Sequence, residues 1–277
     1  MTKMKIVADS SADTLKIKEV EFSVASLKIN TSYTEYIDNE SLDVEKMVDE
    51  LSKYNGKSTT ACPGPGDWLE AFGDAQYIFC VCITSGLSGS YNAACVAKET
   101  YESNNPGRHV FVIDSLSAGP ELKLYIEKLR EYILEGKAFE EICSAIAEYK
   151  QKTALLFMLE STKNLANNGR INPLVSKAVG LLGIRIVGKA SDVGELEVMD
   201  KCRGEKKALN TIVSHMKKIG HKGGKVRIGH ICNEGAAATL KDMIMAEFKN
   251  SQVEIYPSRG LCSFYAEKGG LMIGFES

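Results

Sequence analysis

Short apolar runs alternate with helical patterns through the first half of the chain, and this alternation constrains the fold more than any other feature. The runs are KIVAD, YIFCVCI and HVFVID, and the segments SSADTLKIKEV, SGSYNAACVAKETY and SLSAGPELKLYIEKLREYILEG follow them in that order with helical spacing. Strands that alternate with helices are joined by crossovers and run in one direction. We therefore predict an α/β fold with a mainly parallel sheet and flanking helices.

The pattern changes near residue 153. Two strand-like runs, IRIVGKA and ELEVMDK, are joined by SDVG, which is a hairpin signal, and a short helix is expected between Asn172 and Gly183. Further on, we predict a helix over 204–218, a strand KVRIGHI, a helix EGAAATLKDMIMAEFK, and two strands, QVEIYP and LMIGF. Because 277 residues exceed the size of most single cores, we predict two domains, an N-terminal one over 1–153 and a C-terminal α/β one over 154–277.

The composition argues against several classes of protein. The 34 basic and 36 acidic residues nearly balance, so the chain has no net positive charge that would attract a polyanion, and nucleic acid is not expected as a partner. The longest apolar run is too short to span a bilayer and the first residues lack the apolar region of a signal peptide, so we expect a cytoplasmic protein. The eight cysteines have no zinc-ligand spacing, and neither a metal nor a cofactor is expected.

Three loops carry hydroxyl groups where a predicted strand ends and a helix begins. Ligands gather at this edge of a parallel sheet, and the free amides of a helix start favour a carboxylate or phosphate. Ser, Thr and Asp at such positions also serve as ordinary helix caps, which is the simpler interpretation for Asp9 and Asp114. The candidate ligand-binding residues in these loops are Ser10, Thr84, Gly86, Ser88, Gly89, Asp114 and Ser115.

Two other functions remain open at this point. Ser88 could be the nucleophile of an esterase-like enzyme with His230 as its base, although the loop is one residue short of the Gly-x-Ser-x-Gly pattern. The helix starts alone would also suit a small phosphorylated metabolite, but no nucleotide-binding motif is present. An anion pocket without an evident base favours a binding protein over both, and no catalytic residue is predicted.

Taken together, these loops resemble the DegV family. The matching segments extend along nearly the whole chain and are KIVADSSADT, TACPGPGDWLEAF, TSGLSGSYNAA, VIDSLSAG, NNGRI and GGLMIGF. The resemblance implies two α/β domains and a long-chain fatty acid held in an apolar tunnel. It also implies that such a protein can be the carrier subunit of a bacterial fatty acid kinase, which presents the acyl carboxylate to a separate ATP-binding subunit.

The resemblance also assigns residues. It implies that Thr60 and Ser88 hold the carboxylate, that Arg170 lies near the cleft, and that Arg203 faces a kinase partner. The chain departs from the family pattern at Ala61 and Gly64, where hydroxyl residues are usual. It also departs where the headgroup histidine would stand, because YAEKG places Tyr265 there, a residue whose hydroxyl can still donate a hydrogen bond.

An acyl tail needs an apolar wall, and the segment Pro173–Val187 is our candidate for it. Helical apolar stripes usually belong to the core, so the competing interpretation is ordinary packing. Complete burial of a sixteen-carbon chain is worth on the order of 10 kcal/mol before association costs, at about 0.8 kcal/mol per methylene. Hydrogen bonds to the carboxylate would therefore fix its orientation more than they would set the affinity.

Overall fold

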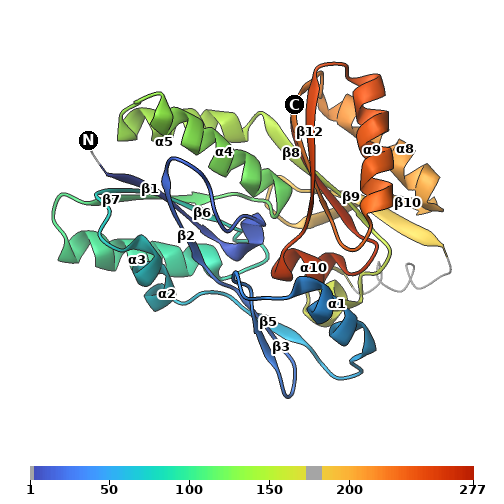
Figure 1. Ribbon diagram of the computed structural model, residues 1–277, viewed down its shortest axis with the longest axis horizontal. Coiled ribbons are helices and arrows are strands. Elements are labelled where there is room, and N and C mark those ends of the chain that lie inside the picture. Colours follow the sequence, from blue (N-terminus) through green and yellow to red (C-terminus); the bar gives the residue numbers. More distant parts are fainter. Residues whose placement is uncertain (1–2, 173–182) are drawn as a thin grey trace.

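The computed structural model describes residues 3–172 and 183–277. Its first sheet is entirely parallel, as predicted, with the strand order β2-β1-β6-β7. Figure 1 shows this sheet in the blue and green half of the molecule. Its strands are β1 (Met4–Asp9), β2 (Glu21–Ala25), β6 (Tyr77–Cys82) and β7 (His109–Asp114).

Helices cover both faces of this sheet because alternate residues of each apolar strand point to opposite sides. Ile6 and Phe79 face α4 (Pro120–Leu134) and α5 (Phe139–Lys150). Val7 and Cys80 face the other side, where α2 (Pro65–Phe72) and α3 (Ser90–Asn104) pack. The parallel α/β arrangement predicted from the alternating pattern is therefore confirmed.

One helix predicted in this half is wrong. The segment SSADTLKIKEV forms only a 3-10 turn, η1 (Ser10–Ala12), and Asp13 ends it in the left-handed region with φ 53°. The Asp9 carboxylate accepts hydrogen bonds from both the amide and the hydroxyl of Ser11. Such local side-chain bonds to the backbone compete with a continuing helix, and the spacing of apolar residues does not reveal them.

A small antiparallel sheet and a helix extend from the first sheet. The strand order is β4-β3-β5, and α1 lies beside it. These elements are β3 (Lys28–Asn30), β4 (Glu35–Ile37), α1 (Val44–Lys53) and β5 (Thr59–Ala61).

The second half forms a six-stranded mixed sheet with the order β10-β9-β8-β13-β11-β12, seen in yellow to red in Figure 1. Neighbouring strands are antiparallel except β11 and β12. The predicted hairpin is confirmed as the β9–β10 pair. The strands are β8 (Thr153–Leu159), β9 (Ile184–Ala190), β10 (Leu196–Arg203), β11 (Gly224–His230), β12 (Ser251–Pro257) and β13 (Leu271–Glu276).

The two faces of the six-stranded sheet have different neighbours. Leu156 and Met158 point to α8 (Glu205–Ile219) and α9 (Glu234–Glu247) in one core. Leu155 and Phe157 point to the other side, where α10 (Gly260–Ala266) and α6 (Lys163–Asn167) pack. This second side faces the N-terminal half of the chain, and α4 packs against β13.

The division into two domains at 153/154 stays a prediction. The helix expected between Asn172 and Gly183 and most of the proposed tail wall, Pro173–Leu182, lie outside the described residues. Within the described part of the chain, no helix is both long and apolar enough to cross a membrane.

Candidate functional site

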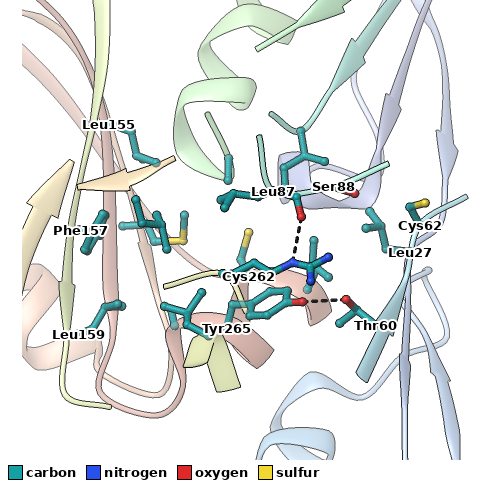
Figure 2. A pocket seen from close by; sticks show the side chains of 18 of the residues that line it. Leu27, Thr60, Cys62, Leu87, Ser88, Leu155, Phe157, Leu159, Cys262 and Tyr265 are labelled. Carbon is teal, nitrogen blue, oxygen red and sulfur yellow. Dashed lines mark hydrogen bonds between the residues drawn. The ribbon is translucent and has the colours of Figure 1, made fainter. Parts of the chain in front are cut away.

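A cavity of about 340 Å³ lies between the two halves of the molecule. Figure 2 shows its wall, with side chains of β8 on one side and the loops of the N-terminal half on the other. Its volume falls within the range of small-molecule sites. The residues that line it are Leu27, Thr60, Ala61, Cys62, Ile83, Leu87, Ser88, Gly89, Ala118, Leu155, Phe157, Leu159, Leu165, Arg170, Leu196, Leu261, Cys262, Tyr265, Ala266 and Met272.

Polar groups gather at one end of this cavity. Thr60 on β5 and Tyr265 on α10 share a hydrogen bond, with their hydroxyl oxygens 2.7 Å apart. Ser88 and Arg170 also line the cavity, so four side chains that were predicted to bind the ligand do border one space. Hydroxyl and guanidinium donors are the groups that a carboxylate accepts from.

The Tyr265 hydroxyl stays neutral in this setting. Burial raises its pKa, while the hydrogen bond with Thr60 and the positive charge of Arg170 act in the opposite direction. A neutral phenol keeps its proton and can donate it in a hydrogen bond. Tyr265 can therefore act as a donor towards an anion at this end of the cavity.

Arg170 holds the serine loop and faces the same space. Its Nε donates to the Leu87 carbonyl oxygen at 3.0 Å, in the loop that carries Ser88. Because both Leu87 and Ser88 line the cavity, this bond fixes part of the wall as well as the guanidinium. Arg170 can thus supply positive charge and position the Ser88 loop.

Ser88 is half-buried, and Gly89 beside it allows a close approach of another segment. A Cβ on Gly89 would lie 3.3 Å from the Cys62 sulfur, tighter than most such contacts. The Ser88 Oγ accepts a weak hydrogen bond, 3.3 Å long, from the amide of Ser90. Its own proton is left available to a ligand in the cavity.

The remaining predicted ligand residues do not line this cavity, and their role in binding stays a prediction. Ser10 is fully buried and its Oγ accepts from the amide of Leu27, a cavity residue, at 3.0 Å. Thr84 donates to the Gly194 carbonyl oxygen at 2.9 Å, and Ser115 donates to the Ser117 carbonyl oxygen at 3.0 Å. All three hydroxyls are engaged with the protein itself.

Asp114 and Gly86 also serve contacts within the protein. The Asp114 carboxylate accepts from the amide and the hydroxyl of Ser85, which braces the loop after β6. Gly86 lies against the β9–β10 turn, because a Cβ there would be 2.9 Å from the Val193 carbonyl oxygen.

Asp9 joins the same loop to the centre of the first sheet. Its carboxylate accepts from the Ile83 amide at 2.9 Å and from the Ser90 hydroxyl at 2.7 Å. Asp9 therefore caps the η1 turn and also braces this loop, and these bonds set the position from which Ser88 reaches the cavity.

The described part of the cavity wall offers no base for a serine nucleophile. Among the described residues that line it there is no His, Asp or Glu, and Ser88 needs such a base to become reactive. His230 lies at the end of β11, where its Nδ1 accepts a long bond from the Asn233 amide. The wall is also mainly apolar, which does not suit a small phosphorylated metabolite.

Most of the apolar wall was not predicted from the sequence. Leu155, Phe157 and Leu159 alternate along β8 and face the cavity together. A period of two was present in TALLFML, but its other positions are apolar as well, so the run indicates only a strand buried on both faces. Leu27, Leu196 and Leu261 reach the same space from distant parts of the chain.

A second, open depression lies on the surface at the end of β10. It is lined by three exposed cations, Arg203 at the last position of β10 and Lys206 and Lys207 in the first turn of α8. Arg203, the residue expected to face a kinase, is thus one of three cations in the same depression. Its other lining residues are Asn210, Thr211 and Ser214.

Comparisons with known proteins agree with this geometry. A DegV protein from Eubacterium eligens, solved with heptadecanoic acid, is 44% identical to this chain, with a TM-score of 0.97 and coverage of 99% of both chains. The Fatty Acid Kinase (Fak) B3 protein of Streptococcus pneumoniae, loaded with linoleic acid, is 42% identical, with a TM-score of 0.97 and coverage of 100% of this chain and 99% of its own.

The relationship extends over the whole sequence. A DegV domain-containing protein of Streptococcus gordonii is 42% identical over 276 residues, which are 98% of each chain. The family model described as "Uncharacterised protein, DegV family" matches residues 3–277. With the parallel sheet, the mixed sheet and the cavity between them, these matches show that the chain belongs to the DegV family.

Proposed function

We propose that this protein binds a long-chain fatty acid, with the tail in the cavity between its halves and the carboxylate at the end where Thr60, Ser88, Arg170 and Tyr265 meet. The observation that carries the proposal is the division of one cavity into an apolar length and a polar end. Relatives of similar structure hold heptadecanoic and linoleic acid, which supports the same ligand class here.

In the proposed site, burial of the acyl tail would supply most of the affinity, and hydrogen bonds to the carboxylate would orient the ligand. Each buried methylene contributes about 0.8 kcal/mol, whereas two or three hydrogen bonds to the carboxylate contribute roughly 1.5–3 kcal/mol each. Ser10 and Asp9 support this site from behind, through the backbone of Leu27 and of the Ser88 loop. The protein itself is proposed to be non-catalytic.

Mass spectrometry of the organic extract from protein purified under non-denaturing conditions tests the ligand class. We expect a fatty acid in stoichiometric amount, or stoichiometric uptake of added palmitate or oleate. Protein that yields no fatty acid and takes up neither acid would contradict the proposal.

A double variant tests the polar end. Thr60→Ala combined with Ser88→Ala should weaken acid binding by tenfold or more while the thermal transition stays cooperative, since each lost hydrogen bond to a charged group is worth about 1.5 kcal/mol or more. Thr59→Ala is the matched control, because Thr59 neighbours Thr60 on β5 but does not line the cavity. Equal affinities in the double variant and the control would remove these two hydroxyls from the site.

We further propose that the protein is a cytoplasmic carrier that presents the acyl carboxylate to an ATP-dependent kinase subunit. The basic depression at Arg203, Lys206 and Lys207 supplies a positive surface for an acidic partner. Electrostatic complementarity of this kind mainly raises the association rate. Arg203→Glu should therefore slow acyl phosphorylation by a fatty acid kinase subunit and leave acid binding unchanged.

The control for this experiment is Lys249→Glu, an exposed lysine that lies after α9 and outside the basic depression. It changes the net charge by the same amount. Equal phosphorylation rates for Arg203→Glu, Lys249→Glu and the unmodified protein would exclude Arg203 from the proposed contact.

A further inference from the structure

Phe157 and Gly188 lie directly opposite each other on neighbouring antiparallel strands of the six-stranded sheet. The same row continues to Met272 on one side and Val198 on the other. Residues that are directly opposite on antiparallel strands point to the same face of a sheet. Phe157 and Met272 line the cavity, so Gly188 is the position in this row where the cavity face carries no side chain.

The ring of Phe157 occupies the space that a side chain at position 188 would need. A Cβ on Gly188 would lie 2.4 Å from the Cζ atom of Phe157 and 2.7 Å from its Cε2 atom. The ring therefore leans across the bare backbone of β9, in the way that an aromatic residue covers a glycine on a neighbouring strand. It leaves space above the sheet that an upright ring would fill.

This pair lies at the apolar end of the cavity. In Figure 2, Leu155, Phe157 and Leu159 form one side of the cavity, and Thr60 and Ser88 lie on the opposite side. An acyl chain whose carboxylate is held at the hydroxyl end would extend towards β8 and meet Phe157. The position of that ring decides how far the chain can continue.

We propose that Phe157, laid over Gly188, is the residue that limits the length of the acyl chain this protein accepts. The inference rests on the proposed function, since it concerns the far end of the same cavity. Phe157 acts here as a specificity-determining residue, and Gly188 acts through it by leaving room for the ring. A bulkier residue at 188 would lift the ring into the cavity, and a smaller residue at 157 would extend the cavity over β9.

Affinities for a series of saturated acids test this inference. Each added methylene that becomes buried should raise the affinity about fourfold, which corresponds to about 0.8 kcal/mol. The gain should stop at the acid length at which the chain reaches Phe157, and we call this length the break. Isothermal titration with acids of twelve to twenty carbons locates the break in the unmodified protein.

Two substitutions at Phe157 should move the break to longer acids. Phe157→Ala opens the most space, and Phe157→Leu opens less and keeps a branched side chain in the core. In both, the acids beyond the original break should gain about fourfold in affinity for each methylene newly accommodated. Gly188→Ala should move the break to shorter acids. Its Cβ would also lie 2.4 Å from the Glu197 carbonyl oxygen, so the two Phe157 variants carry the test if that variant does not fold.

Leu27→Ala is the matched control, because Leu27 lines the cavity near the hydroxyl end in Figure 2. It should lower the affinity for all acids by a similar factor and leave the break in place. A break that stays at the same length in folded Phe157→Ala and Phe157→Leu, while the unmodified protein still binds acids, would overturn this inference alone. Unmodified protein that binds no acid in the series would overturn the proposed function and this inference with it.

Discussion

The hydroxyl groups of Thr60 and Tyr265 lie 2.7 Å apart and join β5 to α10 across the polar end of the cavity. The two residues are separated by 205 positions in the chain. The two hydroxyls share one hydrogen bond, and each carries a proton that it can donate to a carboxylate. In the proposed complex we expect the pair to exchange this one internal hydrogen bond for two bonds to the carboxylate.

Removing the phenol hydroxyl should weaken binding without disturbing the fold. Tyr265→Phe keeps the ring that packs against Phe264 but deletes one donor to the proposed carboxylate. Because a hydrogen bond to a charged group is worth roughly 1.5–3 kcal/mol, the affinity for palmitate should fall about tenfold or more. Tyr132→Phe on α4, away from the cavity wall, is the control for loss of a tyrosine hydroxyl. Equal affinities for the two variants would show that Tyr265 does not bind the headgroup.

The pH dependence of fatty acid binding should be that of a site whose headgroup donor is the phenol of Tyr265. Burial raises the pKa of Tyr265, so its neutral, donating form persists through the neutral range and is lost only as the pH rises through that raised value. Titration of Tyr265 should therefore leave the affinity for a fatty acid unchanged between about pH 7 and 9. Tyr265→His should add a dependence that the present protein lacks, with tighter binding as the pH falls through about 6.5, where an imidazole gains its charge. Fluorescence titrations at several pH values would measure this, and identical pH profiles for the two proteins would contradict it.

The sequence predicted the elements with strong local signals and missed the features that depend on distant contacts. The parallel strands and the β9–β10 hairpin were predictable because apolar runs and turn residues mark them directly. The strands β3, β4 and β5 have three residues each, too few for a periodic signal.

The same distinction applies to the site. Ser88 comes from a loop with recognisable chemistry, Thr60 was assigned through the family resemblance, and both line the cavity. Thr84 has the same chemistry, yet its hydroxyl bonds to the Gly194 carbonyl because the β9–β10 turn enters the loop from the other half of the molecule. Phe157 carries no polar signal at all. No local pattern could show which of these residues line the cavity, because this depends on which distant segment of the chain packs against each of them.

The contact between the β9–β10 turn and the Thr84 loop should contribute to stability. Gly194 has φ 76°, and a Cβ on it would lie 2.0 Å from the Thr84 Oγ1 and 3.1 Å from the Leu116 Cα. Gly194→Ala therefore combines backbone strain with a steric clash. Gly136→Ala is a matched control, because Gly136 has φ 75° and nothing within 4 Å of the added atom.

Urea unfolding of these two variants separates the two costs. Gly136→Ala should lose about 1 kcal/mol of unfolding free energy, from strain in the left-handed region alone. Gly194→Ala should lose clearly more, about 2 kcal/mol or above, since the turn must also move away from Thr84. Equal losses would mean that the turn and the loop are not held in contact.

Two buried carboxylates hold the start of α10, the helix that carries Tyr265. Asp13 accepts from the Arg259 amide at 2.8 Å, and Asp38 accepts from the amides of Gly260 and Leu261, both at 2.9 Å. Burial raises the pKa of Asp13 to about 7, the Arg259 amide opposes this, and the nearby Asp38 carboxylate adds to it. The other groups that couple to Asp13 are the Ser258 hydroxyl, the Cys262 thiol and the Tyr256 phenol.

This arrangement predicts a stability that falls as the pH rises. The folded protein binds the Asp13 proton more tightly than the unfolded chain, whose pKa is near 3.8, so the contribution of Asp13 is lost between about pH 4 and pH 7. At 1.36 kcal/mol per unit the change is at most about 4 kcal/mol. Asp13→Asn keeps an oxygen acceptor for the Arg259 amide but cannot titrate. The unfolding free energy of the unmodified protein relative to Asp13→Asn should therefore decrease across this pH range, as measured by urea unfolding at each pH. A difference that stays constant from pH 4 to pH 8 would mean that Asp13 titrates alike in the folded and unfolded chains.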